Sequence, residues 1–82
     1  MYCTYILFSQ KVKKFYTGQT EDLSRRLEEH NRGKTAFLAS GRPWKLIYCE
    51  EFKTRAEAVN LEKFIKKRGA GRFLKEINIQ LD

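Results

Sequence analysis

The fold of this 82-residue chain can be inferred by starting from the stretch FYTGQT, residues 15–20. It begins like an aromatic, β-branched strand and reaches a lone glycine, Gly18, just before a charged run that resembles a helix. The first backbone N–H groups of a helix have no partner inside the helix, so such a junction can hold a phosphate group. An ordinary tight turn has the same pattern. The rest of the chain has to decide between these two interpretations.

A β-hairpin is predicted around this stretch. Tyr2–Phe8 is aromatic, β-branched and apolar, which is typical of a strand buried on both faces. The polar and basic segment Ser9–Lys14 follows, and Phe15–Gly18 resumes the extended pattern. The two strands are therefore expected to be joined by a basic loop.

A first helix is predicted directly after the hairpin. Thr20 is expected to cap it, with Glu21 and Asp22 in its first turn, because acidic side chains stabilise the start of a helix. Asn31 or Gly33 is expected to end it.

The second half of the chain predicts a loop, a strand and two more helices. These elements are a loop over Thr35–Pro43, a strand over Trp44–Phe52, a helix from the capping box Thr54–Glu57 to about Arg68, and a short helix over Arg72–Asn78. Gly69 and Gly71 are expected to break the chain between the two helices. The order β-β-α-β-α-α predicts an α+β fold, with a three-stranded antiparallel sheet flanked by helices and one domain over residues 1–82.

Charge favours a nucleic acid as partner, because 17 Lys and Arg against 10 Asp and Glu give a net charge of +7. A basic protein without such a partner is the alternative. The side chains expected to contact nucleic acid are Lys11, Lys13, Lys14, Arg25, Lys63, Lys66, Lys67 and Arg68. The apolar run at the N-terminus is too short for a signal peptide or a membrane span, so a cytoplasmic location is expected. Cys3 and Cys49 lack metal-binding spacing and are expected to be buried, reduced thiols.

Two polar groups stand at the edges of predicted apolar helix stripes. On the later helix, Glu62 borders the stripe of apolar residues, where it is either a site residue or a carboxylate paired with a nearby Lys or Arg. On the first helix, Arg26 and His30 share one border at i and i+4, while Arg25 points to solvent. A lone histidine is commonly a packing residue, so this pair is only suggestive.

Tyrosines mark the predicted hairpin. Tyr5 and Tyr16 lie near facing positions of its two strands, where paired aromatic side chains ordinarily stabilise a sheet. Tyr2 and Tyr48 are assigned to packing.

The order and spacing of these residues resemble the GIY-YIG endonuclease family, which includes the UvrC N-terminal nuclease domain. The motifs that carry the resemblance are Cys3-Thr4-Tyr5, Tyr16-Thr17-Gly18, the run from Asp22 to Asn31 with Gly33, Arg42-Pro43-Trp44-Lys45-Leu46, and Ala58-Val59-Asn60-Leu61-Glu62-Lys63. Cys3, Thr4 and Thr17 replace apolar or glycine residues of the family motifs. Gln19 stands where UvrC-type members often carry lysine.

The resemblance implies hydrolysis of a DNA phosphodiester with a divalent metal, Mg²⁺ or Mn²⁺. By position, Tyr5 and Tyr16 match the motif tyrosines, Arg26 the catalytic arginine and Glu62 the metal-binding glutamate. His30 falls where relatives have tyrosine or histidine, and Gly18 would let the strand approach the phosphate closely. One carboxylate is enough for Mg²⁺, which keeps several waters and takes phosphate oxygens.

Three functions therefore remain open from the sequence. The first is a UvrC-like endonuclease in repair, recombination or mobile-DNA processing. The second is a nucleic-acid-binding module of the same fold with weak or no turnover. The third, a basic surface for an acidic protein, leaves Tyr5, Tyr16, Arg26, His30 and Glu62 without a role. No aromatic platform for reading bases stands out in the sequence.

Overall fold

The predicted order of strands and helices is confirmed by a computed structural model, which describes residues 1–32 and 40–79. The elements are β1 (Tyr2–Ser9), β2 (Lys14–Thr20), α1 (Leu23–Asn31), β3 (Lys45–Phe52), α2 (Arg55–Arg68) and α3 (Ala70–Glu76). Most of the predicted loop over Thr35–Pro43, and Gly33, lie outside the described residues. None of the helices in the described ranges is long and apolar enough to cross a membrane.

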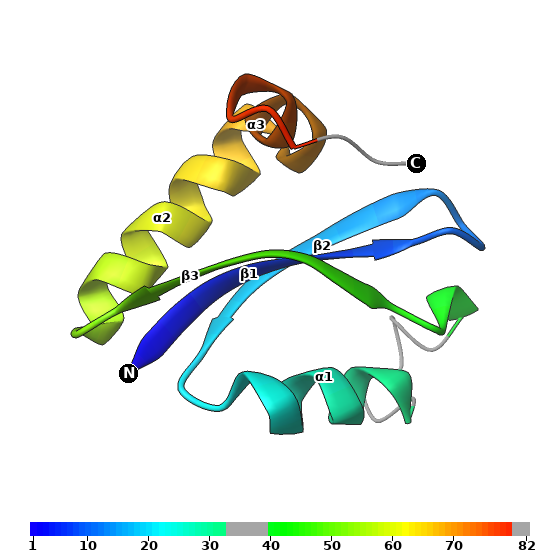
Figure 1. Ribbon diagram of the computed structural model, residues 1–82, viewed down its shortest axis with the longest axis horizontal. Coiled ribbons are helices and arrows are strands. Elements are labelled where there is room, and N and C mark those ends of the chain that lie inside the picture. Colours follow the sequence, from blue (N-terminus) through cyan, green and yellow to red (C-terminus); the bar gives the residue numbers. More distant parts are fainter. Residues whose placement is uncertain (33–39, 80–82) are drawn as a thin grey trace.

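The three strands form one antiparallel sheet in the order β2-β1-β3 (Figure 1). Tyr5, in the central strand β1, pairs with Gly18 of β2 on one side and Cys49 of β3 on the other. Strands β2 and β3 are therefore the edges of the sheet.

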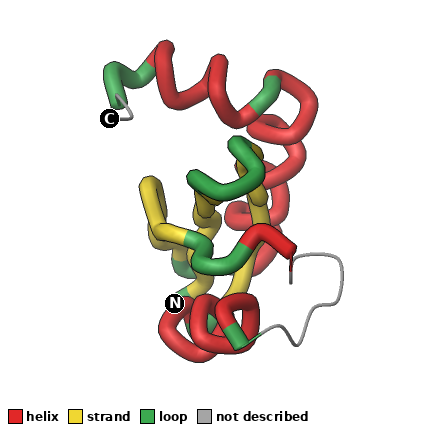
Figure 2. Tube along the Cα trace, turned by 90° about the vertical axis from the view of Figure 1, so that its right-hand side faces the viewer, coloured by secondary structure: helices red, strands yellow, loops and turns green. Residues whose placement is uncertain are grey.

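The sheet separates two apolar layers, because successive side chains of a strand point to opposite faces. On one face, Tyr5 and its apolar neighbours pack against Leu23 and Leu27 of α1. On the other face, Ile6 packs with Ile65 of α2 and with residues of α3. Figure 2 shows α1 below the strands and α3 above them. The prediction that the first strand is buried on both faces is confirmed.

The start of α1 differs from the prediction. Thr20 still belongs to β2, where it pairs with Cys3, so the helix can begin only after it. The N-cap is Asp22, whose Oδ1 accepts a hydrogen bond of 3.1 Å from the Arg25 N–H. Thr20 instead accepts a hydrogen bond from the Asp22 N–H through its hydroxyl oxygen. The predicted cap at Thr20, with acidic residues in the first turn, is therefore wrong.

The end of α1 is anchored to the start of β3. Asn31 is the last helical residue, which confirms the first of the two predicted ends, Asn31 or Gly33. Its side chain accepts a hydrogen bond of 2.6 Å from the Trp44 N–H and donates one of 3.2 Å to the Trp44 carbonyl. This two-point contact fixes the helix against the sheet.

The C-terminal helices follow the predicted signals only in part. The capping box is confirmed, because the Thr54 hydroxyl accepts a hydrogen bond from the Glu57 N–H. Gly69 ends α2 with a φ of 94°, a value that favours glycine. Gly71, predicted as a second break, lies inside α3, because one left-handed residue is enough to redirect the chain. A Cβ at Gly71 would lie 3.3 Å from the Phe15 ring, so this glycine lets α3 pack closely on β2.

The two cysteines are both free thiols, but only Cys3 is buried. Cys49 is exposed, so its predicted burial is wrong. It lies on β3 at the edge of the sheet, where solvent reaches a side chain that would be covered in the central strand.

Candidate active site

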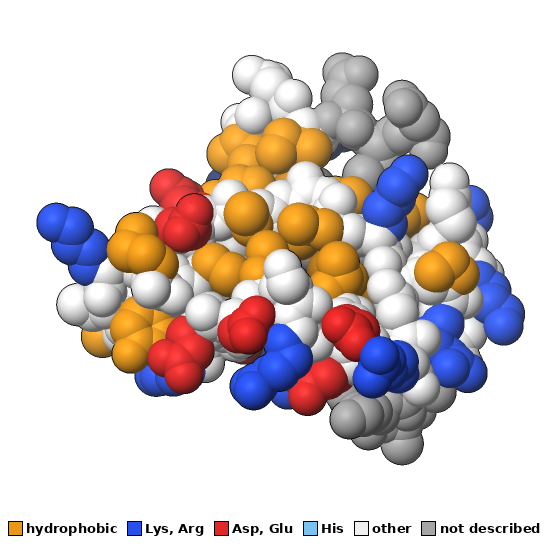
Figure 3. Space-filling model, turned by 60° about the horizontal axis from the view of Figure 1, so that its bottom comes forward, with side chains coloured by type: hydrophobic (Ala, Val, Ile, Leu, Met, Phe, Trp, Pro, Cys, Tyr) orange, Lys and Arg blue, Asp and Glu red, His pale blue; other side chains and the backbone are white. Residues whose placement is uncertain are grey.

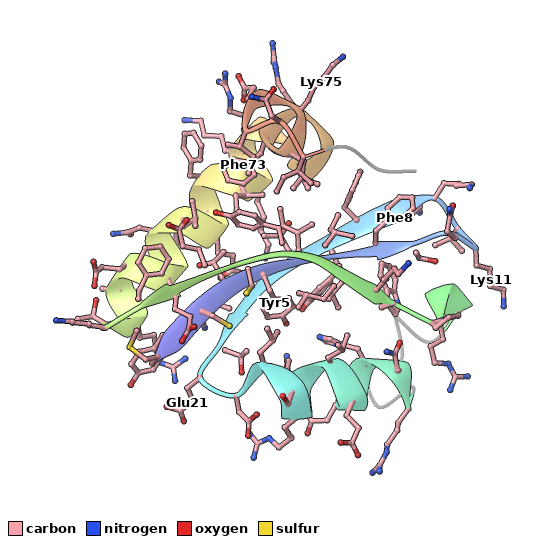
Figure 4. All side chains as sticks on the ribbon, in the orientation of Figure 1. Tyr5, Phe8, Lys11, Glu21, Phe73 and Lys75 are labelled. Atoms are coloured by element: carbon pink, nitrogen blue, oxygen red, sulfur yellow. The ribbon has the colours of Figure 1, made fainter. Side chains whose placement is uncertain are left out.

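An aromatic cluster occupies the sheet face that α1 covers. Tyr5 comes from β1, Tyr16 from β2 and His30 from the last turn of α1. The Tyr5 hydroxyl and His30 Nε2 share a hydrogen bond of 3.2 Å, and the Tyr16 and His30 rings lie 5.0 Å apart between centroids. Tyr16 pairs with Leu7 while Tyr5 pairs with Gly18, so the two tyrosines are diagonal neighbours on one face. Figure 4 shows Tyr5 between the sheet and α1.

Arg26 adds a positive charge to this cluster. It stands one turn before His30 on α1, and hydrogen bonding with Tyr5 raises the pKa of the guanidinium. Arg26 also interacts electrostatically with Tyr16. Its side chain is 44% exposed, so the group that contacts the tyrosines also reaches solvent. The neighbouring Arg25 is exposed too, and its backbone N–H donates the capping hydrogen bond to the Asp22 side chain at the start of the helix.

The two tyrosines differ in access. Tyr5 is 1% exposed, and burial raises the pKa of its hydroxyl to about 12, although the hydrogen bond from Arg26 acts in the opposite direction. Tyr5 is therefore protonated at neutral pH. Tyr16 is half-buried on an edge strand. Only Tyr16 of this pair is accessible to a molecule outside the protein.

His30 is fully buried, and burial is the main cause that lowers the pKa of its ring below 6.5, with the Arg26 charge as the second. At a pH between the lowered pKa of folded His30 and the ordinary value of about 6.5 in the unfolded chain, the unfolded chain binds more protons than the folded one. The free energy of unfolding therefore falls as the pH decreases from about 6.5. The slope reaches at most about 1.4 kcal/mol per pH unit for one group.

We expect His30→Gln to remove this slope in urea unfolding between pH 7.5 and 5.5. Equal slopes in both proteins would contradict the assignment.

Gly18 makes room for Tyr5. A Cβ at this position would lie 2.6 Å from the Tyr5 hydroxyl oxygen and 2.8 Å from its Cζ, and a buried ring cannot move aside freely. The sequence assigned Gly18 to a close approach of phosphate, and the packing of Tyr5 is a second, structural reason for a glycine.

We expect Gly18→Ala to lower the free energy of unfolding by about 1–3 kcal/mol, the usual cost of overpacking a core. Gly71→Ala is the matched control. Its Cβ would meet only the Phe15 ring at 3.3 Å, and alanine favours a helix over glycine by about 1 kcal/mol. Urea unfolding of both variants measures the difference, and equal stability of the two would argue against the packing role of Gly18.

Glu62 lies in the other layer, on α2. Its side chain is 19% exposed, and its carboxylate accepts a hydrogen bond of 2.7 Å from Lys66 Nζ. Lys66 also lines an open hollow of about 680 Å³ along the β2 edge, together with Lys13, Lys14, Phe15, Tyr16, Thr17 and Ala70. The edge of β2 is therefore the part of the sheet at which the tyrosine face and the helix of Glu62 meet.

The donor set suits a hard cation with few protein ligands. Among residues 1–32 and 40–79, no three or more His, Cys, Asp or Glu side chains are grouped as metal ligands. Glu62 already holds the positive charge of an ammonium group in a partly covered position. One carboxylate of this kind fits Mg²⁺ or Mn²⁺ if water and phosphate oxygens complete the coordination.

Several of the predicted nucleic-acid-binding side chains line two hollows. The hairpin lysines Lys13 and Lys14 share a hollow with Lys66, whereas Lys67 and Arg68 line a second one. Lys11, Arg25 and Lys63 are exposed. On the face in Figure 3, basic side chains gather at the right-hand end, where the β1–β2 hairpin lies in Figure 1, while acidic and basic ones alternate along the lower border. Figure 4 places Lys11 at that same end.

Arg55 is a further cation near the site, and it is not among the residues predicted from the sequence. Its guanidinium donates a hydrogen bond of 3.1 Å to the Gln19 side chain and lies 3.9 Å from a Glu21 carboxylate oxygen. It also stacks over the Tyr2 ring, 4.8 Å from the centroid. The contact joins residues 36 positions apart, so no local pattern could have indicated it. A positive charge thus stands beside Gln19, where UvrC-type proteins often have lysine.

This α+β order, with tyrosine, arginine and histidine side chains on one sheet face, is the arrangement that the motif resemblance predicts. Residues 1–73 match the GIY-YIG catalytic domain, and the chain belongs to this family. The resemblance indicated by the motifs is therefore confirmed.

Several relatives are similar to this chain in sequence. The UPF0213 protein YazA of Bacillus subtilis is 41% identical over 58 residues, which cover 70% of this chain and 59% of that protein. A UPF0213 protein of Enterococcus faecalis is 44% identical over 66 residues, which cover 77% of this chain and 74% of that protein. The solution NMR structure of the UPF0213 protein BH0048 from Bacillus halodurans has a TM-score of 0.58 and 31% identity, and covers 96% of this chain and 87% of that one. The matched region is about three fifths of the length of the first relative.

Proposed function

We propose that this chain is a divalent-metal-dependent endonuclease that hydrolyses DNA phosphodiester bonds, in repair, recombination or mobile-DNA processing. The observation that carries the proposal is the position of Arg26, which contacts Tyr5 and interacts with Tyr16 while part of its side chain stays in solvent. Structural packing alone does not require a cation in an aromatic cluster. A phosphodiester does, because its transition state gains negative charge.

The residues of the cluster have different roles in this proposal. Arg26 holds the phosphate oxygens of the transition state through its planar set of N–H donors. The phenolate form of Tyr16 accepts the proton of the attacking water and becomes the phenol, because Tyr16 is the accessible tyrosine and lies next to Arg26. Tyr5 stays protonated and, with His30, orients Arg26 and Tyr16.

Glu62 is the proposed metal ligand. The bound cation would neutralise charge on the phosphate and stabilise the leaving oxygen. Lys66 bonds one oxygen of the Glu62 carboxylate, so the cation would either bind the other oxygen or displace the ammonium group. A DNA strand lying along the edge of β2 would meet Tyr16, Lys13 and Lys14 on its way to Glu62. We further propose that Arg55 supplies the charge that Gln19 lacks.

Nicking of supercoiled plasmid tests the proposal. We expect nicking with Mg²⁺ or Mn²⁺ and none with EDTA. DNA binding without nicking in either metal would favour the second candidate, a nucleic-acid-binding module. That candidate is supported by the ion pair between Lys66 and Glu62, which neutralises the metal ligand in the structure.

A further inference from the structure

An exposed aromatic side chain lies among cations at the junction of α2 and α3. Phe64 is 51% exposed, and its ring meets the buried Phe73 ring edge-to-face at 6.2 Å between centroids. Phe73 in turn packs on Tyr48. Phe64 is therefore supported from below by a row of rings, while about half of it remains in solvent.

Three basic residues surround this ring. Phe64, Lys67, Arg68 and Arg72 line a hollow of about 350 Å³. Arg68 forms a paired hydrogen bond with the Glu76 carboxylate, which holds its guanidinium in place. With Glu76 included, the hollow still has an excess of positive charge.

We propose that this hollow binds an unpaired nucleotide, whose base stacks on Phe64 and whose phosphates contact Lys67 and Arg72. An aromatic face accepts any base, and stacking contributes about 1–3 kcal/mol per base. Basic side chains next to the ring neutralise the adjoining phosphates. The volume is within the range of about 300–1,000 Å³ that is common for small-ligand sites. A base inside a duplex is covered on both sides, so only a single-stranded or frayed segment fits.

The charge of the hollow argues against two other ligands for an exposed aromatic residue, namely a second copy of the chain and an apolar partner. A second copy of the chain docked through the same surface would bring Lys67, Arg68 and Arg72 against their own equivalents. Like charges at such an interface are repulsive. An apolar partner would have to bury the excess positive charge that remains after Arg68 pairs with Glu76, which costs free energy.

The hollow is separate from the candidate active site. Residues two positions apart on a helix point about 200° apart, so Phe64 and Glu62 lie on nearly opposite sides of α2. The inference deepens the proposed function, on which it rests for the class of ligand. It implies a substrate that has a single-stranded segment, bound on the side of α2 away from Glu62 and therefore away from the cleaved bond.

Binding in EDTA tests the inference without any cleavage. The probes are fluorescein-labelled oligo(dT) and an abasic strand of equal length, measured by anisotropy. We expect the wild-type chain to bind oligo(dT) about 5- to 150-fold more tightly than the abasic strand, which corresponds to one stacked base. Phe64→Leu keeps an apolar side chain without an aromatic face, and should lower this ratio at least about 5-fold. Phe64→Trp should keep it, and oligo(dT) should quench the new indole, because the native Trp44 is only 5% exposed.

Ile77→Ala is the matched control, because Ile77 is a second exposed apolar residue, at 41%. It should leave the ratio unchanged, with circular dichroism confirming the fold of every variant. An unchanged ratio in Phe64→Leu, or no binding of oligo(dT) by the wild type, would overturn the inference. An unchanged ratio together with a shift from dimer to monomer by light scattering would assign the surface to self-association instead. Loss of plasmid nicking with an intact ratio would defeat the proposed endonuclease and leave this site standing.

Discussion

Replacement of Arg26 by alanine is expected to lower the rate of DNA cleavage by about 100-fold or more, the usual loss when a transition-state charge donor is removed. The guanidinium hydrogen-bonds with Tyr5 and is still partly open to solvent, so it is both oriented and accessible. Its ion pair with Glu29 is long, at 3.7 Å, and exposed, so its loss should hardly affect stability. Lysine at this position should not restore the rate, because a point charge cannot bond two phosphate oxygens in one plane.

Arg25→Ala is the matched control for this prediction. It removes the same charge from the same helix, one residue away, from a side chain that does not belong to the cluster. Only a modest and salt-dependent part of DNA binding should be lost. The measurement is single-turnover cleavage at saturating protein, with circular dichroism as the test of folding. Equal losses in the two alanine variants would mean that both arginines are binding charges, and the proposed site would be wrong.

Glu62→Gln is expected to reduce cleavage to the level seen with EDTA, because it keeps the size of the side chain but removes the charge that would hold the cation. The chain should stay folded, since the pair with Lys66 is an i,i+4 contact with a 57% exposed lysine, and such pairs contribute about 0.3–0.5 kcal/mol. DNA binding should be kept or rise, because Lys66 is released to meet phosphate.

Glu28→Gln is the control for the loss of a helical ion pair. Glu28 pairs with Arg32 at the same i,i+4 spacing on α1, away from the β2 edge. This variant should cleave like the wild type. Binding of Mn²⁺, followed by the relaxation of water protons, separates loss of the metal from loss of chemistry. Cleavage by Glu62→Gln that resists EDTA would remove the metal assignment.

The strands and helices were predictable because their signals are local. A run of aromatic and β-branched residues has the same meaning at Tyr2–Phe8 in any fold, and the capping box at Thr54 needs only four consecutive residues. The errors arose where tertiary contacts change a local preference. Pairing with Cys3 kept Thr20 in the sheet, and Gly69 alone redirected the chain, so Gly71 remained helical.

The order of the elements, the excess of positive charge and the motif positions of the family could all be derived from the amino-acid sequence. Three features are visible only in the folded chain: Tyr5 is buried and Tyr16 accessible, Glu62 lies in a different layer from Arg26, and Phe64 is exposed among cations. The physical reason is that spacing along the chain specifies which side of its own strand or helix a residue occupies. Which elements then cover that side depends on strand register and helix packing, and these bring together residues far apart in the sequence.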